Sequence, residues 1–173
     1  MTGLTERELG AINGAGFNSR EWNLNKLQVK EGSTFKSLPL KIVRLQGKGA
    51  LRKGLTAFIA LHKEECIAAR PLEVDENKMF YLGYFEHREP DFGTSLKDFG
   101  VGSTLTAEAI EHARRKGAMS VSTYDIRNDA WGRHLVESLG GTPAISPYGS
   151  HVQWSSDDEY GRGKYREFLL REK

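Results

Sequence analysis

Two strand-length apolar runs that follow one another constrain the fold of this chain most. The first covers residues 55–62 and the second residues 66–74, and only the charged sequence KEE separates them. Apolar runs of this length with a short polar break are typical of a β-hairpin. A third run at residues 79–87, MFYLGYFEH, is rich in aromatic residues, which favour strands. The three runs predict an antiparallel meander in the middle of the chain.

An amphipathic helix is expected after the meander. Between Gly102 and Lys116 apolar residues recur at helical spacing with charges between them, and Gly117 stands where helices commonly end. A strand at residues 119–125 and a second amphipathic helix at residues 131–139 come next. The predicted order after the meander is therefore helix, strand, helix.

The two ends of the chain are less regular. Thr5 followed by Glu8 predicts a capping box that opens a short helix. One or two strands are expected between residues 27 and 43. Near the end of the chain we expect a strand around residues 150–154 and a charged helix near residues 163–171.

The composition fits one soluble domain. The chain has 173 residues, of which 38% are apolar and 28% charged, which are ordinary globular values. No apolar run approaches the roughly 20 residues that span a bilayer, and the first residues do not resemble a secretory signal. Cys66 is the only cysteine, so an internal disulfide is excluded and a reducing, cytoplasmic compartment is expected. We interpret Cys66 as a small buried apolar residue.

Positive charge is concentrated in one segment, although the net charge is only +2. No acidic residue occurs between Gly32 and Lys63, where the basic residues are Lys36, Lys41, Arg44, Lys48, Arg52, Lys53 and Lys63. Such a cluster could contact a phosphate, a nucleic acid or the nucleotide end of a cofactor. The alternative is a solvated positive surface.

Gly100 and Gly102 stand where an extended segment is expected to meet the helix. Glycines allow the backbone to approach a ligand, and the N–H groups at a helix start favour a phosphate, although a tight turn would use the same residues. A Walker loop is excluded because Ser103, not lysine, follows Gly102. A dinucleotide fingerprint is excluded because Leu105 occupies the position of its third glycine and no early parallel strand is present.

The sequence from Lys97 to Gly102 resembles the Gln/Arg-x-x-Gly-x-Gly/Ala loop of the GNAT N-acetyltransferases. The resemblance covers residues 55–154 and implies one α/β domain over residues 1–173. Its sheet would be mixed, mostly antiparallel and flanked by helices, with a V-shaped opening between two central strands for the acyl-pantetheine. Acetyl-CoA would be the co-substrate. The implied cofactor-binding residues are Lys97, Phe99, Gly100, Val101, Gly102, Ser103, Thr104 and Asn128.

Two positions depart from the pattern of that family. Lys97 replaces glutamine or arginine, so a point charge replaces a fork of donors. Val136 stands where many members place a tyrosine, and valine cannot protonate a leaving thiolate. Either CoA leaves as a thiolate, or a group such as Tyr124 or His134 supplies the proton, or catalysis is weak or absent.

A general base is expected at the end of the aromatic run, because an amine must lose a proton before it attacks a thioester. Glu86 is the first candidate and His87 the second, and the alternative for both is a solvated charge at a strand end. Together with Tyr124 they form the predicted catalytic set. No Cys, His and Asp cluster with ligand spacing predicts a metal site.

These features predict an N-acetyltransferase that transfers an acetyl group from acetyl-CoA to an amine by direct attack in a ternary complex. The basic segment favours an anionic acceptor, such as a nucleotide, a nucleic acid or an acidic protein. No membrane partner is expected, and a homodimer stays open. The alternative, motivated by Val136 and the basic segment, is a GNAT-like module that binds CoA or nucleic acid without transfer.

Overall fold

The computed structural model describes residues 3–34, 36–50, 52–83, 86–87, 100–118, 120–124 and 165–169. They belong to two compact units. The first unit comprises Met1–Glu73 and Tyr84–Ala109, and the second comprises Val74–Gly83 and Ile110–Lys173. The expectation of one domain over the whole chain stays a prediction.

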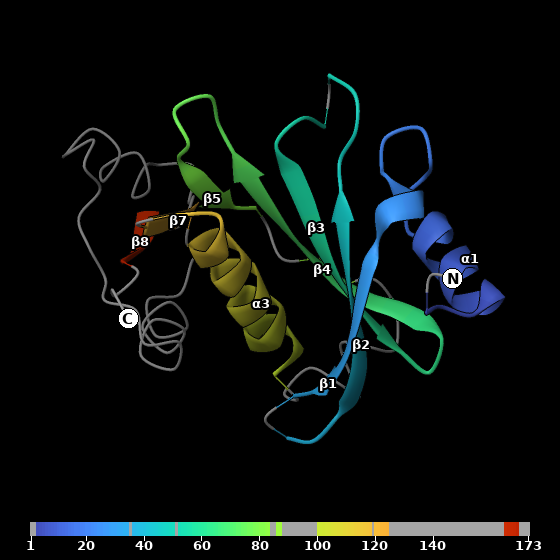
Figure 1. Cartoon of the computed structure of the whole chain (residues 1–173). Helices are drawn as coiled ribbons and strands as arrows, with labels where there is room; N and C mark the ends of the chain where they lie inside the picture. Colours follow the sequence, from blue (N-terminus) through green and yellow to red (C-terminus); the bar gives the residue numbers. More distant parts are fainter. Residues whose placement is uncertain are drawn as a thin grey trace, which may run out of the picture. The chain divides into compact units, whose positions relative to one another are not determined.

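An antiparallel sheet of consecutive strands forms the first unit (Figure 1). Its first four strands are β1 (Gln28–Ser33), β2 (Pro39–Gln46), β3 (Leu55–His62) and β4 (Glu65–Val74). Each of them pairs with the next in antiparallel register. A further strand, β6 (Glu86–His87), pairs antiparallel with β4 at Ala69 and Ala68. The predicted hairpin and the predicted strands before it are confirmed.

The turn between β3 and β4 contains only two residues, Lys63 and Glu64. Their φ angles are 49° and 65°, so both central residues are left-handed, as in a type I′ turn. This turn has the twist of the strands that it joins, which is why two-residue hairpin loops favour it. The strand pairing offsets the cost of placing two non-glycine residues in this conformation.

Helix α1 (Glu6–Gly14) begins with the predicted capping box. The Glu8 N–H donates to Thr5 Oγ1 at 3.1 Å, and the Thr5 N–H donates to Glu8 Oε1 at 2.9 Å. Lys41 on β2 donates to the same Glu8 oxygen at 2.9 Å. The Thr5 hydroxyl donates to Glu64 at 2.9 Å. The helix start is therefore fixed both to β2 and to the β3–β4 turn.

Glu8 makes the stability of this unit depend on pH. Burial raises the pKa of its carboxyl, but the bonds from Lys41 and Thr5 outweigh burial, so the pKa lies below its ordinary value of 4.5. A carboxyl with a lowered folded pKa stabilises the fold above 4.5, and this contribution is lost as the pH falls through the folded pKa.

We expect Glu8→Gln to lower the free energy of unfolding by about 1 kcal/mol at neutral pH, because a charged hydrogen bond is lost. The difference from wild type should disappear in acid. Urea unfolding of both proteins at a series of pH values, from neutral to strongly acidic, measures it. A difference that stays constant over the series would contradict the role of Glu8.

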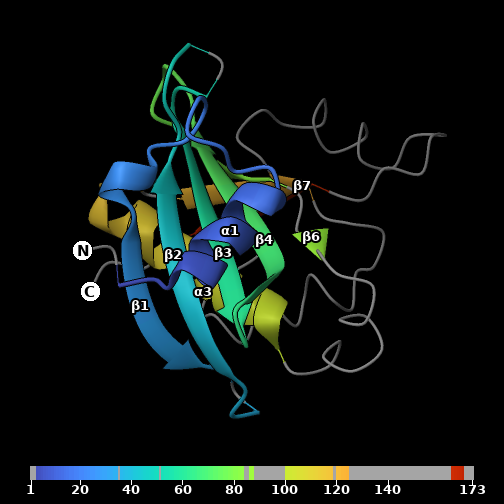
Figure 2. The same ribbon diagram turned by 90° about the vertical axis from the view of Figure 1, so that its right-hand side faces the viewer.

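A hydrophobic core of the first unit lies between α1 and the sheet (Figure 2). Its buried members are Ile12, Phe17, Trp22, Val43, Leu45, Ala57, Ile59, Leu61, Cys66 and Ala69. Cys66 is 8% exposed, as predicted. The part of helix α3 that belongs to this unit, residues 101–109, lies on the opposite face of the sheet. Lys30 of β1 contacts Glu108 of that helix at 2.6 Å. Both faces of β3 are therefore covered, which agrees with its nearly continuous apolar sequence.

Helix α3 (Val101–Arg115) confirms the amphipathic helix predicted from Gly102 to Lys116. Its buried apolar residues are Val101, Leu105, Ala109, Ile110 and Ala113. Gly117 has a φ of 92° and donates to the Arg114 carbonyl, while the Ala118 N–H donates to the Ala113 carbonyl at 3.0 Å. This is a Schellman motif, and it confirms the predicted helix end.

The second unit contains a short mixed sheet. Strand β5 (Phe80–Leu82) pairs parallel with β7 (Ser120–Tyr124), and β7 pairs antiparallel with β8 (Tyr165–Leu169). The strands of the chain are thus mostly antiparallel with one parallel pair, and helices accompany them, as predicted. The aromatic run forms two short strands instead of one, β5 and β6, which fall in different units.

The charged helix predicted near residues 163–171 is wrong, because Tyr165–Leu169 is a strand. The register places Tyr165 opposite Tyr124 and Phe168 opposite Val121. Aromatic residues favour strands, and backbone pairing with β7 adds to this preference. The charges that suggested a helix are compatible with either structure.

Two predictions fall on residues outside the described ranges, the helix at residues 131–139 and the strand at residues 150–154. The V-shaped opening between two central strands stays a prediction. In the described ranges, no helix has the length and apolar character that crossing a membrane requires.

Candidate functional site

The first turn of α3 contains five of the predicted cofactor-binding residues. Gly100 precedes the helix with a φ of 83°, a value that glycine adopts without strain. Its carbonyl accepts from the Thr104 N–H at 3.0 Å and from the Thr104 hydroxyl at 2.9 Å. The Thr106 hydroxyl donates to the Gly102 carbonyl at 2.7 Å. Both threonine hydroxyls therefore bond to the helix itself.

The backbone amides of residues 100–103 are the groups at this turn that can bind a ligand. Gly100 has no side chain that could accept from them, and no acceptor for them is present among the residues that the structure describes. Such N–H groups, together with the positive end of the helix dipole, attract an anion. Val101 is only 2% exposed, so its contribution is limited to the backbone.

For three of the remaining predicted site residues the structure gives a backbone position. Glu86 and His87 form β6, with their Cα atoms opposite those of Ala69 and Ala68. Tyr124 is the last residue of β7. Lys97, Phe99, Asn128, His134 and Val136 lie outside the described residues. The structure thus brings Gly100–Thr104 into one turn and places the candidate base on a strand next to β4.

The basic residues at positions 36–63 do not form one patch. Lys41 bonds to Glu8 on the α1 side of the sheet, whereas Arg44 bonds to Gln28 and faces the other side, since strand residues three apart point oppositely. Lys48 and Lys53 lie in the connection between β2 and β3, and Lys63 lies beyond the end of β3. Positive charge is therefore spread over both faces and both ends of the strand.

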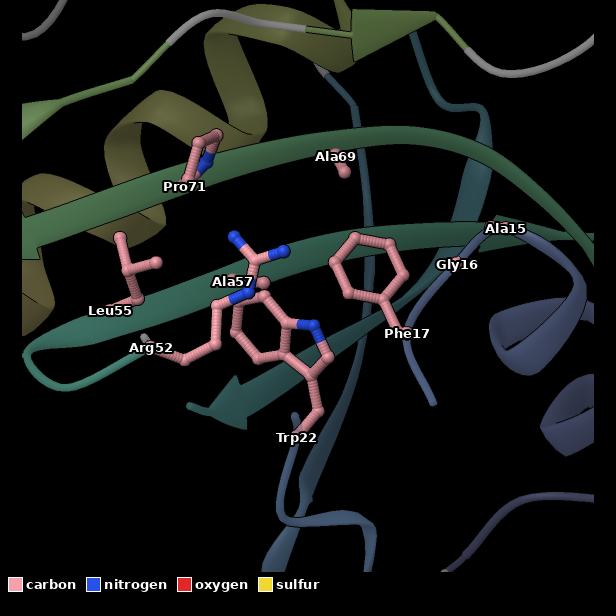
Figure 3. A pocket seen from close by; sticks show the side chains of 9 residues that line it. All are labelled: Ala15, Gly16, Phe17, Trp22, Arg52, Leu55, Ala57, Ala69 and Pro71. Atoms are coloured by element: carbon pink, nitrogen blue, oxygen red, sulfur yellow. The ribbon is translucent and has the colours of Figure 1, made fainter. Parts of the chain in front are cut away.

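A cavity of about 290 Å³ lies in the first unit on the α1 side of the sheet (Figure 3). It is lined by Ala15, Gly16, Phe17, Trp22, Arg52, Leu55, Ala57, Ala69 and Pro71. This Arg52 cavity was not predictable from the sequence, because its walls come from separate segments of the chain. The glycines at positions 47, 49 and 54 are a local signal of a turn beside it.

Arg52 is the charged residue in the described lining. Its guanidinium carbon lies 5.9 Å from the centroid of the Trp22 ring, within cation–π range. Its Nη2 lies 3.5 Å from both carboxylate oxygens of Glu21, at the long limit of hydrogen bonding. Its Nε is shielded from solvent and has no acceptor among the described residues. The guanidinium is therefore only partly satisfied.

Ala69 connects the cavity with the candidate base. Its side chain lines the cavity, and its Cα is the register partner of Glu86 across the β4–β6 pair. Cα atoms that face each other in an antiparallel pair are about 5 Å apart. The cavity therefore borders the strand segment on which Glu86 lies.

Metal chemistry has no support in the described part of the chain. No group of three or more His, Cys, Asp and Glu side chains there is arranged to hold an ion.

No family model matches the sequence, and no curated protein sequence matches it. Solved structures of similar fold exist. The GNAT domain of S. lividans PAT superposes with a TM-score of 0.56 at 11% identity, over 82% of this chain and 97% of that domain. A GNAT-family acetyltransferase from Staphylococcus aureus gives 0.49 at 12% identity, over 70% of this chain and 71% of the other. A Bacillus subtilis acetyltransferase in complex with CoA gives 0.49 at 18%, over 69% and 79%.

The similarity to the S. lividans domain, at 11% identity, shows the fold and nothing further. Within this chain, the antiparallel β1–β4 sheet, Gly100 before α3 and the parallel β5–β7 pair agree with that similarity. The chain has the fold of the GNAT acetyltransferases.

Proposed function

We propose that this protein binds acetyl-CoA at the start of α3 and transfers the acetyl group to an amine. The observation that carries the proposal is the set of amides at residues 100–103, which begin with the left-handed Gly100 and have no acceptor among the described residues, in a chain with the GNAT fold. These amides would bind the pyrophosphate of CoA. By the resemblance of the loop, Lys97 and Phe99 would flank the pyrophosphate and Asn128 would lie near the pantetheine arm.

Transfer would be direct, from acetyl-CoA to the amine within the ternary complex, without a covalent enzyme intermediate. Glu86, or His87, takes a proton from the ammonium group of the acceptor. The amine nitrogen then attacks the thioester carbonyl carbon, so that a C–N bond forms and the C–S bond breaks. As the C–S bond breaks, the attacking nitrogen gives up its second proton to solvent and CoA leaves as a thiolate, which Tyr124 or solvent protonates.

The acceptor that we propose carries an anionic group as well as its amine. The basic residues between β1 and β4 are spread over both faces of the sheet, but they outnumber the acidic residues of that segment, which disfavours a small polycation nearby. A nucleotide, a nucleic acid or an acidic protein would satisfy this requirement. The Arg52 cavity supports the same class, because its lining contains a cation.

Gly102→Glu tests the proposal directly. A carboxylate in the first turn of α3 would repel the pyrophosphate and occupy the space beside the amides. We expect at least a tenfold loss of affinity for CoA, which is about 1.4 kcal/mol. Isothermal calorimetry measures this loss. Lys116→Glu, just beyond the other end of the same helix, is the matched control and should bind CoA as wild type does.

Equal CoA affinities of wild type and Gly102→Glu would remove this turn from the site. Release of free thiol from acetyl-CoA in the presence of an amine separates the transferase from the non-catalytic module that Val136 suggests. CoA binding without thiol release for any amine would favour that module.

A further inference from the structure

We propose that the Arg52 cavity is the acceptor site and takes a small compound that combines one planar apolar group with one anionic group. The inference rests on the proposed function only where it calls the ligand the amine acceptor. Ligand binding in the cavity does not involve CoA and is tested without it.

The apolar wall of the cavity is rigid. Phe17 and Trp22 pack edge to face with centroids 5.2 Å apart, and they are only 7% and 6% exposed. Ala57 and Ala69 form the opposite surface, and their small side chains leave the space open. At about 290 Å³ the cavity is near the lower limit of ligand pockets, roughly 300–1,000 Å³. It therefore fits one ring with short substituents.

Arg52 supplies the recognition of charge. Charge-assisted hydrogen bonds are ordinarily about 2.7–2.9 Å long, so the 3.5 Å contacts to Glu21 are loose. Because the Nε is shielded from solvent, an anion would be bound by the terminal nitrogens of the guanidinium, one of which makes only these loose contacts. The Arg52 side chain is 39% exposed, so a ligand can reach it from solvent. A carboxylate would pair with the planar fork of donors.

Backbone bonds hold the rim of the cavity in place before any ligand binds. Trp22 and Gly47 form an isolated β-bridge, and the Gly47 N–H donates to the Leu55 carbonyl at 2.8 Å. The Lys48 N–H donates to the Glu21 carbonyl at 2.9 Å. Main-chain hydrogen bonds thus join the segment that contains Glu21 to the segment that leads to Arg52. Little ordering entropy would be lost on binding.

The position of the cavity explains why its ligand would be the acceptor. Ala69, in the lining, stands opposite Glu86, the residue that we propose as general base. A ligand whose anionic end contacts Arg52 would extend along β4 toward that strand. An amine at its other end would approach the base.

The probe for this site is 4-(aminomethyl)benzoate, which carries a ring, a carboxylate and an amine. The matched ligand is 4-(aminomethyl)benzamide, which has the same shape without the negative charge. Binding is measured without CoA by calorimetry and by the NMR shift of the Trp22 indole N–H, assigned with Trp22→Phe. We expect the benzoate to bind at least about tenfold more tightly and to shift the Trp22 signal.

Two variants isolate the charge. Arg52→Met keeps an apolar stem over Trp22 and removes the anion partner, so it should weaken benzoate binding at least about tenfold and leave benzamide binding unchanged. Lys53→Met removes a neighbouring exposed cation outside the lining and should change neither affinity more than about twofold. If Arg52→Met does not fold, the comparison of the two ligands on the wild-type protein decides.

Equal affinity for the two ligands, or binding that leaves the Trp22 signal unmoved, would overturn the assignment of the cavity. The proposed function fails separately. Wild-type protein that binds the benzoate but not CoA would overturn the transferase proposal, whereas CoA binding without benzoate binding would overturn the cavity proposal. Acetylation of the probe by wild type, reduced at least about tenfold by Arg52→Met at low probe concentration, would support both.

Discussion

Replacement of Gly47 with alanine is expected to lower the free energy of unfolding by about 3 kcal/mol, at the upper end of the cost of overpacking. The added Cβ would lie 2.3 Å from the Arg52 carbonyl oxygen and 2.7 Å from the Arg52 Cβ. The backbone cannot easily move apart there, because Gly47 bonds to Leu55 and bridges to Trp22. The change should therefore disturb the rim of the Arg52 cavity as well as stability.

Urea unfolding followed by far-ultraviolet circular dichroism measures this loss. Gly10→Ala is the matched control, since its Cβ would meet nothing within 4 Å and Gly10 lies inside α1. Alanine there should stabilise the helix by roughly 0.5–1 kcal/mol. The two Gly→Ala changes thus have opposite expected signs. An unchanged free energy of unfolding for Gly47→Ala would show that the β2–β3 connection can move to accommodate the added Cβ.

The second large effect is expected at Glu86. Glu86→Gln keeps the size of the side chain and removes its basic oxygen, so turnover should fall by roughly 10²-fold or more. CoA affinity should hardly change, because the turn at residues 100–103 is a separate part of the site. The position of Glu86 on β6, opposite Ala69 of the Arg52 cavity, is the structural support for this prediction.

Acetylated product, quantified by mass spectrometry at saturating acetyl-CoA and amine, measures the turnover of Glu86→Gln. His87→Gln serves as the matched comparison on the same strand. A base that titrates should also appear as an acidic limb in the pH–rate profile of wild type, and that limb should be missing in Glu86→Gln. Turnover equal to wild type would assign the role to His87 or to solvent.

Features that depend on neighbouring residues were predictable from the sequence. The capping box at Thr5 and Glu8, the β3–β4 hairpin and the Schellman end at Gly117 each follow from a few adjacent side chains. The glycine turn before α3 was predictable for the same reason. Its geometry, a left-handed glycine followed by a helix, needs only Gly100 and the residues after it.

Features that depend on distant partners were not predictable. Tyr165–Leu169 is a strand because β7 offers it a backbone to pair with, and no local signal marks that edge. Within the aromatic run, β5 takes as its parallel partner β7, a strand far along the chain that no residue near β5 indicates. The Arg52 cavity requires the segment after α1, the β2–β3 connection, β3 and β4 together, and Arg52 looked like one cation among seven in the sequence.

The pairing order of the strands also has a consequence for folding kinetics. In β1–β4 every strand pairs with its neighbour in the sequence, so each ladder closes only a short loop. The parallel β5–β7 pair can form only after the chain between these strands, including α3, has folded back. Contacts between residues so far apart in the sequence form more slowly. Pulsed hydrogen exchange during refolding should therefore show amide protection in β2 and β3 before β7, and simultaneous protection would refute this order. During synthesis, the sheet that carries the Arg52 cavity would be assembled while β7 and β8 are still being added to the chain.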